Sequence, residues 1–182
     1  MLVSLGVLLV IVAGTLFLAR GCQFSPDGPT VDSSAQPTVD ARRELGVAAR
    51  RVPFDVRSPA VPADWHANTV NTSYVGDANT GIPAVRAGWV TPGNTYLRLS
   101  QSTAPIDGLV VMEAGGAVAA TPSGTVDVGG TTWTRFPGKG TETSWVTSLG
   151  DVHVLITGTG SDTEFHTLAT ATQAAAPLPK TR

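Results

Sequence analysis

The residues best suited to bind a metal ion are three histidines and the aspartates near two of them. His153 and His166 stand close in sequence to Asp151 and Asp162, and the third histidine is His66. Imidazole and carboxylate are ordinary zinc ligands, but protein zinc sites usually show short fixed spacings such as H-x-x-x-H, and no such spacing occurs here. We therefore predict no metal and no cofactor, and a metal site would need residues gathered from distant loops.

The run GTGSDTE at 158–164 joins a glycine turn to acidic side chains, a combination that could bind an anion or act as an acidic site. Ser161 followed by Glu164 also fits the capping box of a helix N-terminus. The carboxylates of Asp162 and Glu164 would repel the anion that a helix start otherwise attracts. The pattern therefore favours a capped helix, whose buried stripe would be Phe165, Leu168, Ala169 and Thr172.

Acyl-transfer and acid/base patterns are also missing from the sequence. There is no Gly-x-Ser-x-Gly elbow and no Ser-x-x-Lys pair. Asp107 and Glu113 are six residues apart, so they would not share a face of a helix and make a poor acid/base pair. We predict no catalytic residues, and a hydrolase or metal-dependent enzyme with a site assembled from distant loops stays the alternative.

Four tryptophans could form a carbohydrate platform or a hydrophobic core. They fall at predicted strand positions that alternate with polar residues, which favours packing against a sheet. Two adjacent, exposed tryptophans would reverse this interpretation. The four are Trp65, Trp89, Trp133 and Trp145.

Overall charge argues against a nucleic-acid partner. The chain of 182 residues has a net charge of −2, and from residue 53 onward it carries ten acidic and seven basic side chains. No basic face is therefore available to neutralise phosphates. The 20 glycines and 13 prolines favour short strands and many turns in one domain.

Residues 1–19, MLVSLGVLLVIVAGTLFLA, contain no charged side chain. As a helix they would be about 28 Å long, close to the hydrocarbon thickness of a bilayer. We predict a transmembrane anchor over 1–20 and a single-pass protein of the cell membrane. With the anchor's N-terminus inside, the domain that follows is extracytoplasmic.

Gly21-Cys22 is similar to the end of a bacterial lipoprotein signal, in which a small residue precedes a lipidated cysteine. Arg20 and Ala19 depart from that pattern, and the apolar run is long enough to span a membrane. The sequence therefore favours an uncleaved anchor, with lipidation of Cys22 as the alternative. Cys22 is the single cysteine, so the domain does not use disulfides.

Residues 21–40 have the composition of a disordered spacer, and residues 41–52 are predicted to form a short basic helix capped by Asp40. Two interpretations of its basic residues stay open. They could contact anionic lipid headgroups beside the membrane, or they could form a solvated helix face, since Glu44 interrupts the cluster. The basic residues are Arg42, Arg43, Arg50 and Arg51.

The domain is predicted over 53–173, followed by a flexible tail over 174–182. Its motifs are, in order, PFDVRSP, PADWHAN, AGWVTPGNTYLRLSQS, GGTTWTRF, SWVTSLGDVHVLITG and FHTLA. In this order they resemble an actinobacterial family, domain of unknown function 4245, over about residues 40–173 together with the N-terminal anchor. The resemblance implies an envelope protein with one transmembrane helix and an outward-facing domain, and it implies no mechanism.

Two stretches of the domain repeat, one from Trp89 and one from Trp145. Both begin Trp-Val-Thr and continue through a turn, an apolar strand and an Asp before a helical segment. Further strands are expected at 67–75, 125–128 and 131–136, with Gly129-Gly130 as a hairpin turn. Thr91 to Asn94 fits a type II turn.

The fold class that follows is α+β. We expect a mainly antiparallel, twisted sheet built from two ββα-like units, with the helices near Asp107 and Asp162 packed on one face. The function we expect is a non-enzymatic binding or interaction module that takes an unknown protein or an apolar ligand. A structural scaffold in an envelope complex is a further alternative.

Overall fold

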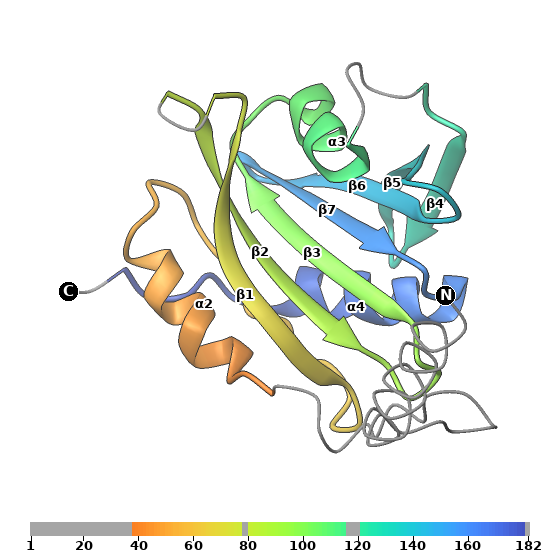
Figure 1. The fold of residues 1–182 in the computed structure, drawn as a ribbon, viewed down its shortest axis with the longest axis horizontal. Helices are drawn as coiled ribbons and strands as arrows, with labels where there is room; N and C mark the ends of the chain where they lie inside the picture. Colours follow the sequence, from red (N-terminus) through yellow and green to blue (C-terminus); the bar gives the residue numbers. More distant parts are fainter. Residues whose placement is uncertain (1–37, 78–79, 116–120, 181–182) are drawn as a thin grey trace, which may run out of the picture. The chain divides into compact units, whose positions relative to one another are not determined.

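The architecture is taken from a computed structural model that describes residues 38–77, 80–115 and 121–180 (Figure 1). These residues belong to one compact unit, Pro37–Arg182. The predicted anchor at 1–20, Cys22 and most of the predicted spacer lie outside the described residues. Within the described ranges, no helix combines the length and the apolar character needed to cross a membrane.

A seven-stranded antiparallel sheet forms the centre of the domain, which confirms the predicted α+β class. Its strand order is β1-β2-β3-β7-β6-β5-β4, so all neighbours are consecutive in sequence except β3 and β7. The strands are β1 (His66–Val75), β2 (Ile82–Val90), β3 (Tyr96–Ser102), β4 (Gly124–Val128), β5 (Thr131–Pro137), β6 (Thr143–Leu149) and β7 (Val152–Gly158).

Three helices are described, and they cover both faces of the sheet. α2 (Ala41–Ala49) and α4 (Asp162–Ala174) pack on one face, where Leu45 and Phe165 join the same hydrophobic cluster. α3 (Ile106–Ala114) packs on the opposite face, where Leu109 and Val110 meet Leu155. The prediction that the helices share one face is therefore wrong.

The alternation of side chains along β3 explains the two faces. Leu97 and Leu99 point to the face of α2 and α4, whereas Arg98 and Ser100 point to the face of α3. Both faces of the sheet therefore carry side chains against which a helix can pack.

The repeated units are recognisable in the strands but not in the helices. Trp89 pairs with Leu97 in the first unit, and Trp145 pairs with Ile156 in the second. All four side chains belong to the cluster under α2 and α4. α3 leaves its unit toward the opposite face, so the similarity ends where the helices begin.

The space between the sheet and the α2/α4 layer is filled with large side chains. Trp89, Trp133, Trp145 and Phe165 are fully buried or nearly so. Trp65 is partly buried against the same cluster and immediately precedes β1. The tryptophans therefore pack the core, as expected, and do not form an exposed platform.

Local turn and cap chemistry follows the sequence at two of three places. Gly129 and Gly130 both have positive φ, as a type I′ hairpin requires. Ser161 and Glu164 form the predicted capping box of α4, and the four residues predicted for its buried stripe are buried. At the β2–β3 turn, Asn94 rather than Gly93 takes the left-handed conformation (φ 60°), so the predicted type II turn is wrong.

The ends of the domain meet beside the sheet. α2 ends at Ala49, and Val52 beyond it is still buried in the core. Where the sequence predicts a flexible tail, Pro177 pairs with Arg57 and the amide of Leu178 donates to Val56 O at 2.8 Å. The C-terminal segment up to Lys180 is thus packed against the segment that leaves α2.

Candidate functional site

The first candidate surface lies on α2 and the turn directly after it, and we call its four arginines the arginine surface: Arg42, Arg43, Arg50 and Arg51. The helix forms because Asp40 caps it, accepting the amide of Arg43 at 3.0 Å, and because Leu45, Ala48 and Ala49 face the core. The same periodicity leaves Arg42 and Arg43 exposed. Arg50 and Arg51 are exposed in the turn that follows the helix.

Three of these arginines line one open hollow of about 600 Å³. Its walls also include Asp40 and three apolar residues, so guanidinium groups, one carboxylate and apolar side chains line the same hollow. The apolar residues are Val47, Leu178 and Pro179. Within residues 38–77, 80–115 and 121–180, no ion pair involves an arginine of this surface, whereas Arg86, Arg98, Arg135 and Lys180 are each paired with a carboxylate. The structure thus brings together Arg42, Arg43 and Arg50 of the predicted set, with Arg51 directly after them.

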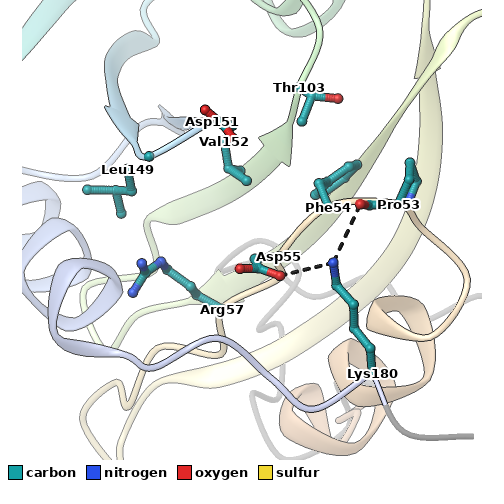
Figure 2. A pocket seen from close by; sticks show the side chains of 10 residues that line it. Pro53, Phe54, Asp55, Arg57, Thr103, Leu149, Asp151, Val152 and Lys180 are labelled. Atoms are coloured by element: carbon teal, nitrogen blue, oxygen red, sulfur yellow. Dashed lines mark hydrogen bonds and ion pairs between the residues drawn. The ribbon is translucent and has the colours of Figure 1, made fainter.

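A second hollow, of about 480 Å³, lies between the segment after α2, the end of β3 and the β6–β7 turn (Figure 2). Lys180 closes it, with its ammonium 3.0 Å from a carboxylate oxygen of Asp55 and 3.4 Å from Pro53 O. Arg57 donates to the carbonyl of Ala175. These basic groups are engaged in holding two chain segments together.

A buried amide fixes the wall of this hollow. Gln101 on β3 accepts the amide of Arg57 at 2.8 Å and donates to Arg57 O at 3.0 Å. Its side chain thereby satisfies both backbone groups of one residue, as a neighbouring strand would. The segment that leaves α2 is therefore held against β3 in the wall of this hollow.

The third hollow, of about 610 Å³, runs along the outward face of α4 beside residues 60–62. Its lining contains no Asp, Glu, Lys or Arg and consists of threonines, His166 and small or apolar groups such as Val61 and Ala171. Its chemistry suits an apolar group of a ligand or a partner.

His153 and His166, which a metal site gathered from distant loops would have to bring together, lie on opposite faces of the sheet. His153 lies on the α3 side of the sheet, where its Nδ1 is 2.8 Å from Ser148 Oγ. His166 lies on the other side, edge-on to Trp145 with ring centroids 5.1 Å apart. Asp162 pairs with Arg135 at 2.9 Å. In the described part of the chain, no three His, Cys, Asp or Glu side chains gather in a way that could hold a metal ion.

A charged cluster that sequence reasoning missed lies under α3. The carboxylate of Glu113 is fully buried and accepts from Arg98 Nε at 2.7 Å, Arg86 Nη2 at 3.1 Å and Ser100 Oγ at 2.6 Å. Arg86 Nε is also 3.0 Å from this carboxylate but is poorly aligned for a hydrogen bond. Because both carboxylate oxygens are engaged by the protein, Glu113 ties α3 to β2 and β3.

One signal in the sequence could have indicated this cluster. Arg86 lies inside the otherwise apolar strand β2, Arg98 lies between two leucines of β3, and Glu113 is an acid in a mostly apolar helix. Buried charges of this kind require partners of opposite sign. Their separations of 27 and 15 residues give no local pattern, so only the pairing of β2 with β3 brings them together.

Glu164 connects the start of α4 to the β2–β3 turn. Its carboxylate accepts from Thr95 Oγ1 at 3.1 Å and from the Ser161 amide at 2.7 Å. Partial burial raises the pKa of Glu164, but hydrogen bonds from Thr91, Ser161 and Thr95 together outweigh it and lower this pKa below its ordinary value of 4.5. The charge is used for capping, as the sequence predicts.

The sheet and the three described helices form an α+β domain, and the arginine surface has no ion-pair partner among the described residues. The chain belongs to the family described as Protein of unknown function (DUF4245), which matches residues 1–172. This match confirms the family resemblance seen in the motifs. Comparison with curated proteins gave no match, and comparison with solved structures gave none either.

Proposed function

We propose that this protein is a single-pass membrane protein whose α+β domain lies outside the cytoplasm, at the surface of the cell membrane, and works there as a binding module. The uncharged apolar run of residues 1–19 supports the anchor. Support for binding rather than catalysis comes from charged groups that the fold itself engages: Glu113, Glu164 and Lys180 hold helices and chain ends.

The observation that carries this proposal is the arginine surface. Four exposed guanidinium groups without an ion-pair partner in the described residues lie on α2 and in the turn directly after it. Near an anionic bilayer each basic group contributes about 1 kcal/mol. Asp40 and Glu44 offset part of this, so the surface is worth roughly 2–4 kcal/mol, or about 30-fold to 1000-fold in residence at the membrane.

The predicted spacer allows this contact. A flexible chain of about 20 residues has a root-mean-square length of roughly 25 Å, and it can fold back as well as extend. α2 can therefore come within the Debye length of about 8–10 Å over which the membrane charge acts. The apolar lining of the hollow, from Val47, Leu178 and Pro179, suits the first carbons below a lipid headgroup.

The test uses the full chain in lipid nanodiscs, with Cys22→Ser and an environment-sensitive fluorophore on Val47→Cys. We expect stronger quenching by headgroup-labelled lipid in discs with anionic phosphatidylglycerol than in pure phosphatidylcholine. Replacing the four arginines by glutamine removes this difference, and Glu44→Gln increases it. As a matched pair, Arg50→Gln reduces quenching whereas Lys139→Gln, on the β5–β6 loop, leaves it unchanged. Equal quenching in both lipids would refute the surface contact.

A separate measurement tests the orientation. Alkaline phosphatase fused after Arg182 is expected to be active in cells, and a fluorescent protein that matures only in the cytoplasm is expected to stay dark. The opposite pattern would contradict an extracytoplasmic domain. The mass of the mature chain then decides between an intact Met1 form and an acylated form that begins at Cys22.

An apolar ligand is a second candidate, favoured by the uncharged hollow along α4. Ala171→Trp would fill this hollow from an already partly exposed position and is expected to abolish binding of an apolar fluorescent probe. If the variant binds the probe as wild type does, the hollow is not a ligand site.

A further inference from the structure

β1 is an edge strand whose second half lacks the features that usually protect an edge. Its β-bulge lies near the start of the strand, between Ala67 and Thr69. β1 lies at one end of the sheet, is 10 residues long and reads HANTVNTSYV, without a charged residue or a proline. Edge strands present unpaired backbone groups, and native proteins normally shorten them or add lysine or proline to prevent pairing with another chain. β1 is therefore suited to accept a further strand.

The opposite edge of the same sheet differs. β4 has five residues, begins at Gly124 with φ 149° and carries the exposed Asp127. A short edge with a charge and an irregular start follows the usual protective pattern. The contrast indicates that the openness of β1 is particular to that edge.

α2 and the chain before it cover only the first part of β1. The amide of Val39 donates to Ala67 O at 2.9 Å, and Ala67 is buried. Farther along the strand Asn71, Thr72 and Tyr74 are exposed. The second half of β1 is thus the accessible half.

Apolar side chains also gather at this end of β1. Tyr74 is 48% exposed and Ile82, which pairs with Val75 across β1 and β2, is 38% exposed. Within the described residues these two are the large hydrophobic side chains that stand out from the surface. They lie on opposite faces of the sheet, because Tyr74 pairs with Pro83 while Val75 pairs with Ile82. A strand added beside β1 would therefore cover apolar side chains on both faces of the sheet.

The sequence of β1 is complementary to itself, and this identifies the occupant. If a second β1 runs antiparallel about a two-fold axis at Thr72, Val70 lies opposite Tyr74 of the other copy, and Asn71 lies opposite Ser73. On one face the pairs then read Val–Tyr, Thr–Thr and Tyr–Val, which are the aromatic–β-branched and Thr–Thr pairs that stabilise sheets. No like charges meet, because β1 has none.

We propose that two copies of this chain associate through β1, forming an antiparallel pair centred on Thr72 that continues the sheet from one copy to the other. The contact is isologous, so it closes after two copies instead of growing into a fibre. It names a partner for the binding module proposed above, a second copy, and it does not depend on the arginine surface or on the direction of the anchor.

The register is tested by cysteine crosslinking of the full chain in nanodiscs and in cells, with Cys22→Ser as background. Opposite residues have Cβ atoms about 4.5–5.5 Å apart, whereas residues offset by four lie too far apart to react. We expect Thr72→Cys to crosslink to itself. A mixture of Val70→Cys and Tyr74→Cys chains is expected to give a heterodimer that neither gives alone, and Thr125→Cys on β4 should not react.

Association itself is tested by light scattering of the full chain in detergent. Thr72 is exposed in the single chain and lies at the proposed two-fold axis, so Thr72→Lys brings two like charges together in the dimer. We expect this variant to raise the dissociation constant of the dimer by about tenfold or more. The matched variant Thr125→Lys, on the other edge strand, is expected to leave the dimer intact. Circular dichroism of both variants verifies that the fold is unchanged.

Several results would overturn the proposal. A wild-type chain that stays monomeric at all concentrations would do so, and so would a dimer that resists Thr72→Lys, which would locate the contact elsewhere. Crosslinking of Thr72→Cys to a different protein in cells would show that β1 accepts another partner. None of these outcomes affects the lipid quenching experiment, so the two proposals can fail separately.

Discussion

Removal of the Glu113 carboxylate is expected to destabilise the domain through the two arginines it leaves behind. The side chain of Glu113 is fully buried, and those of Arg86 and Arg98 are each 20% exposed. Removing one partner of a buried ion pair costs about 3–5 kcal/mol, because the remaining charge stays buried. Since water reaches the arginines in part, we expect Glu113→Ala to cost about 2–3 kcal/mol.

Urea unfolding of residues 37–182, which form one compact unit, measures this loss. With a slope of about 2 kcal/mol per molar urea, the midpoint should fall by about 1–1.5 M. Asp107→Asn on the same helix is the control, because Asp107 is exposed and contributes at most about 1 kcal/mol through the helix dipole. The loss should persist in 1 M salt, since the cluster is buried.

A second variant separates loss of the pair from loss of packing. Replacing the three charged residues together, with Arg86→Met, Arg98→Met and Glu113→Leu, is expected to recover most of the stability lost in Glu113→Ala, because buried ion clusters can be exchanged for apolar groups at little cost. If Glu113→Ala loses less than about 1 kcal/mol, or loses no more than Asp107→Asn, the view that Glu113 ties α3 to the sheet is refuted.

Two further outcomes follow from the structure. The pKa of Glu164 is lowered by folding, so its charge stabilises the fold above the ordinary pKa of 4.5 and this contribution is lost as pH falls through the lower folded pKa. The stability gap between wild type and Glu164→Gln should therefore be present at pH 7 and shrink below pH 4.5 in urea titrations, and a gap that is constant with pH would contradict the hydrogen-bonded carboxylate. Gly158 has φ 149° and lies against the backbone of Tyr96, so Gly158→Ala should lower the free energy of unfolding by more than about 1 kcal/mol. Gly46 on α2 has open space around it, so Gly46→Ala should raise the free energy of unfolding by about 0.5–1 kcal/mol. Equal thermal midpoints for the two variants would refute the reasoning.

The sequence predicts elements well where a local rule decides the structure. The capping box at Ser161 and the paired glycines at 129 and 130 each meet a rule that involves only neighbouring residues, and both are confirmed. The prediction of the β2–β3 turn type was wrong because two neighbouring residues, Gly93 and Asn94, can each adopt the left-handed conformation. Which of them does so depends on the register of the two strands.

The placement of α3 could not be predicted, because it depends on residues distant in sequence. α3 is apolar on most of its surface, so its own pattern does not select a face of the sheet. Leu109 and Val110 pack against Phe136, Val146 and Leu155, which come from strands of the second half. The repeated Trp-Val-Thr motif predicted that the two helices would pack on the same face. Long-range packing and the ion pairs of Glu113 place α3 on the opposite face instead.

The arginine surface was partly predictable. The sequence predicted a short basic helix capped by Asp40, and the structure forms this helix and this cap. The sequence did not indicate that Leu178 and Pro179 would lie beside the arginines, because composition alone predicted a free tail. The hollow therefore depends on a contact between the two ends of the domain.

The strand order has a consequence for how the chain reaches its native state. Every ladder between named strands joins neighbours in sequence except that of β3 with β7, which brings Ser102 to His153. Hairpins form in microseconds, whereas pairing of distant segments must first overcome the entropy of closing the intervening loop. Two meanders, β1–β3 and β4–β7, can thus form early and independently. The rate of folding should therefore be set by one step, the pairing of β7 with β3. β7 is synthesised last of the seven strands, so this pairing also comes last during synthesis.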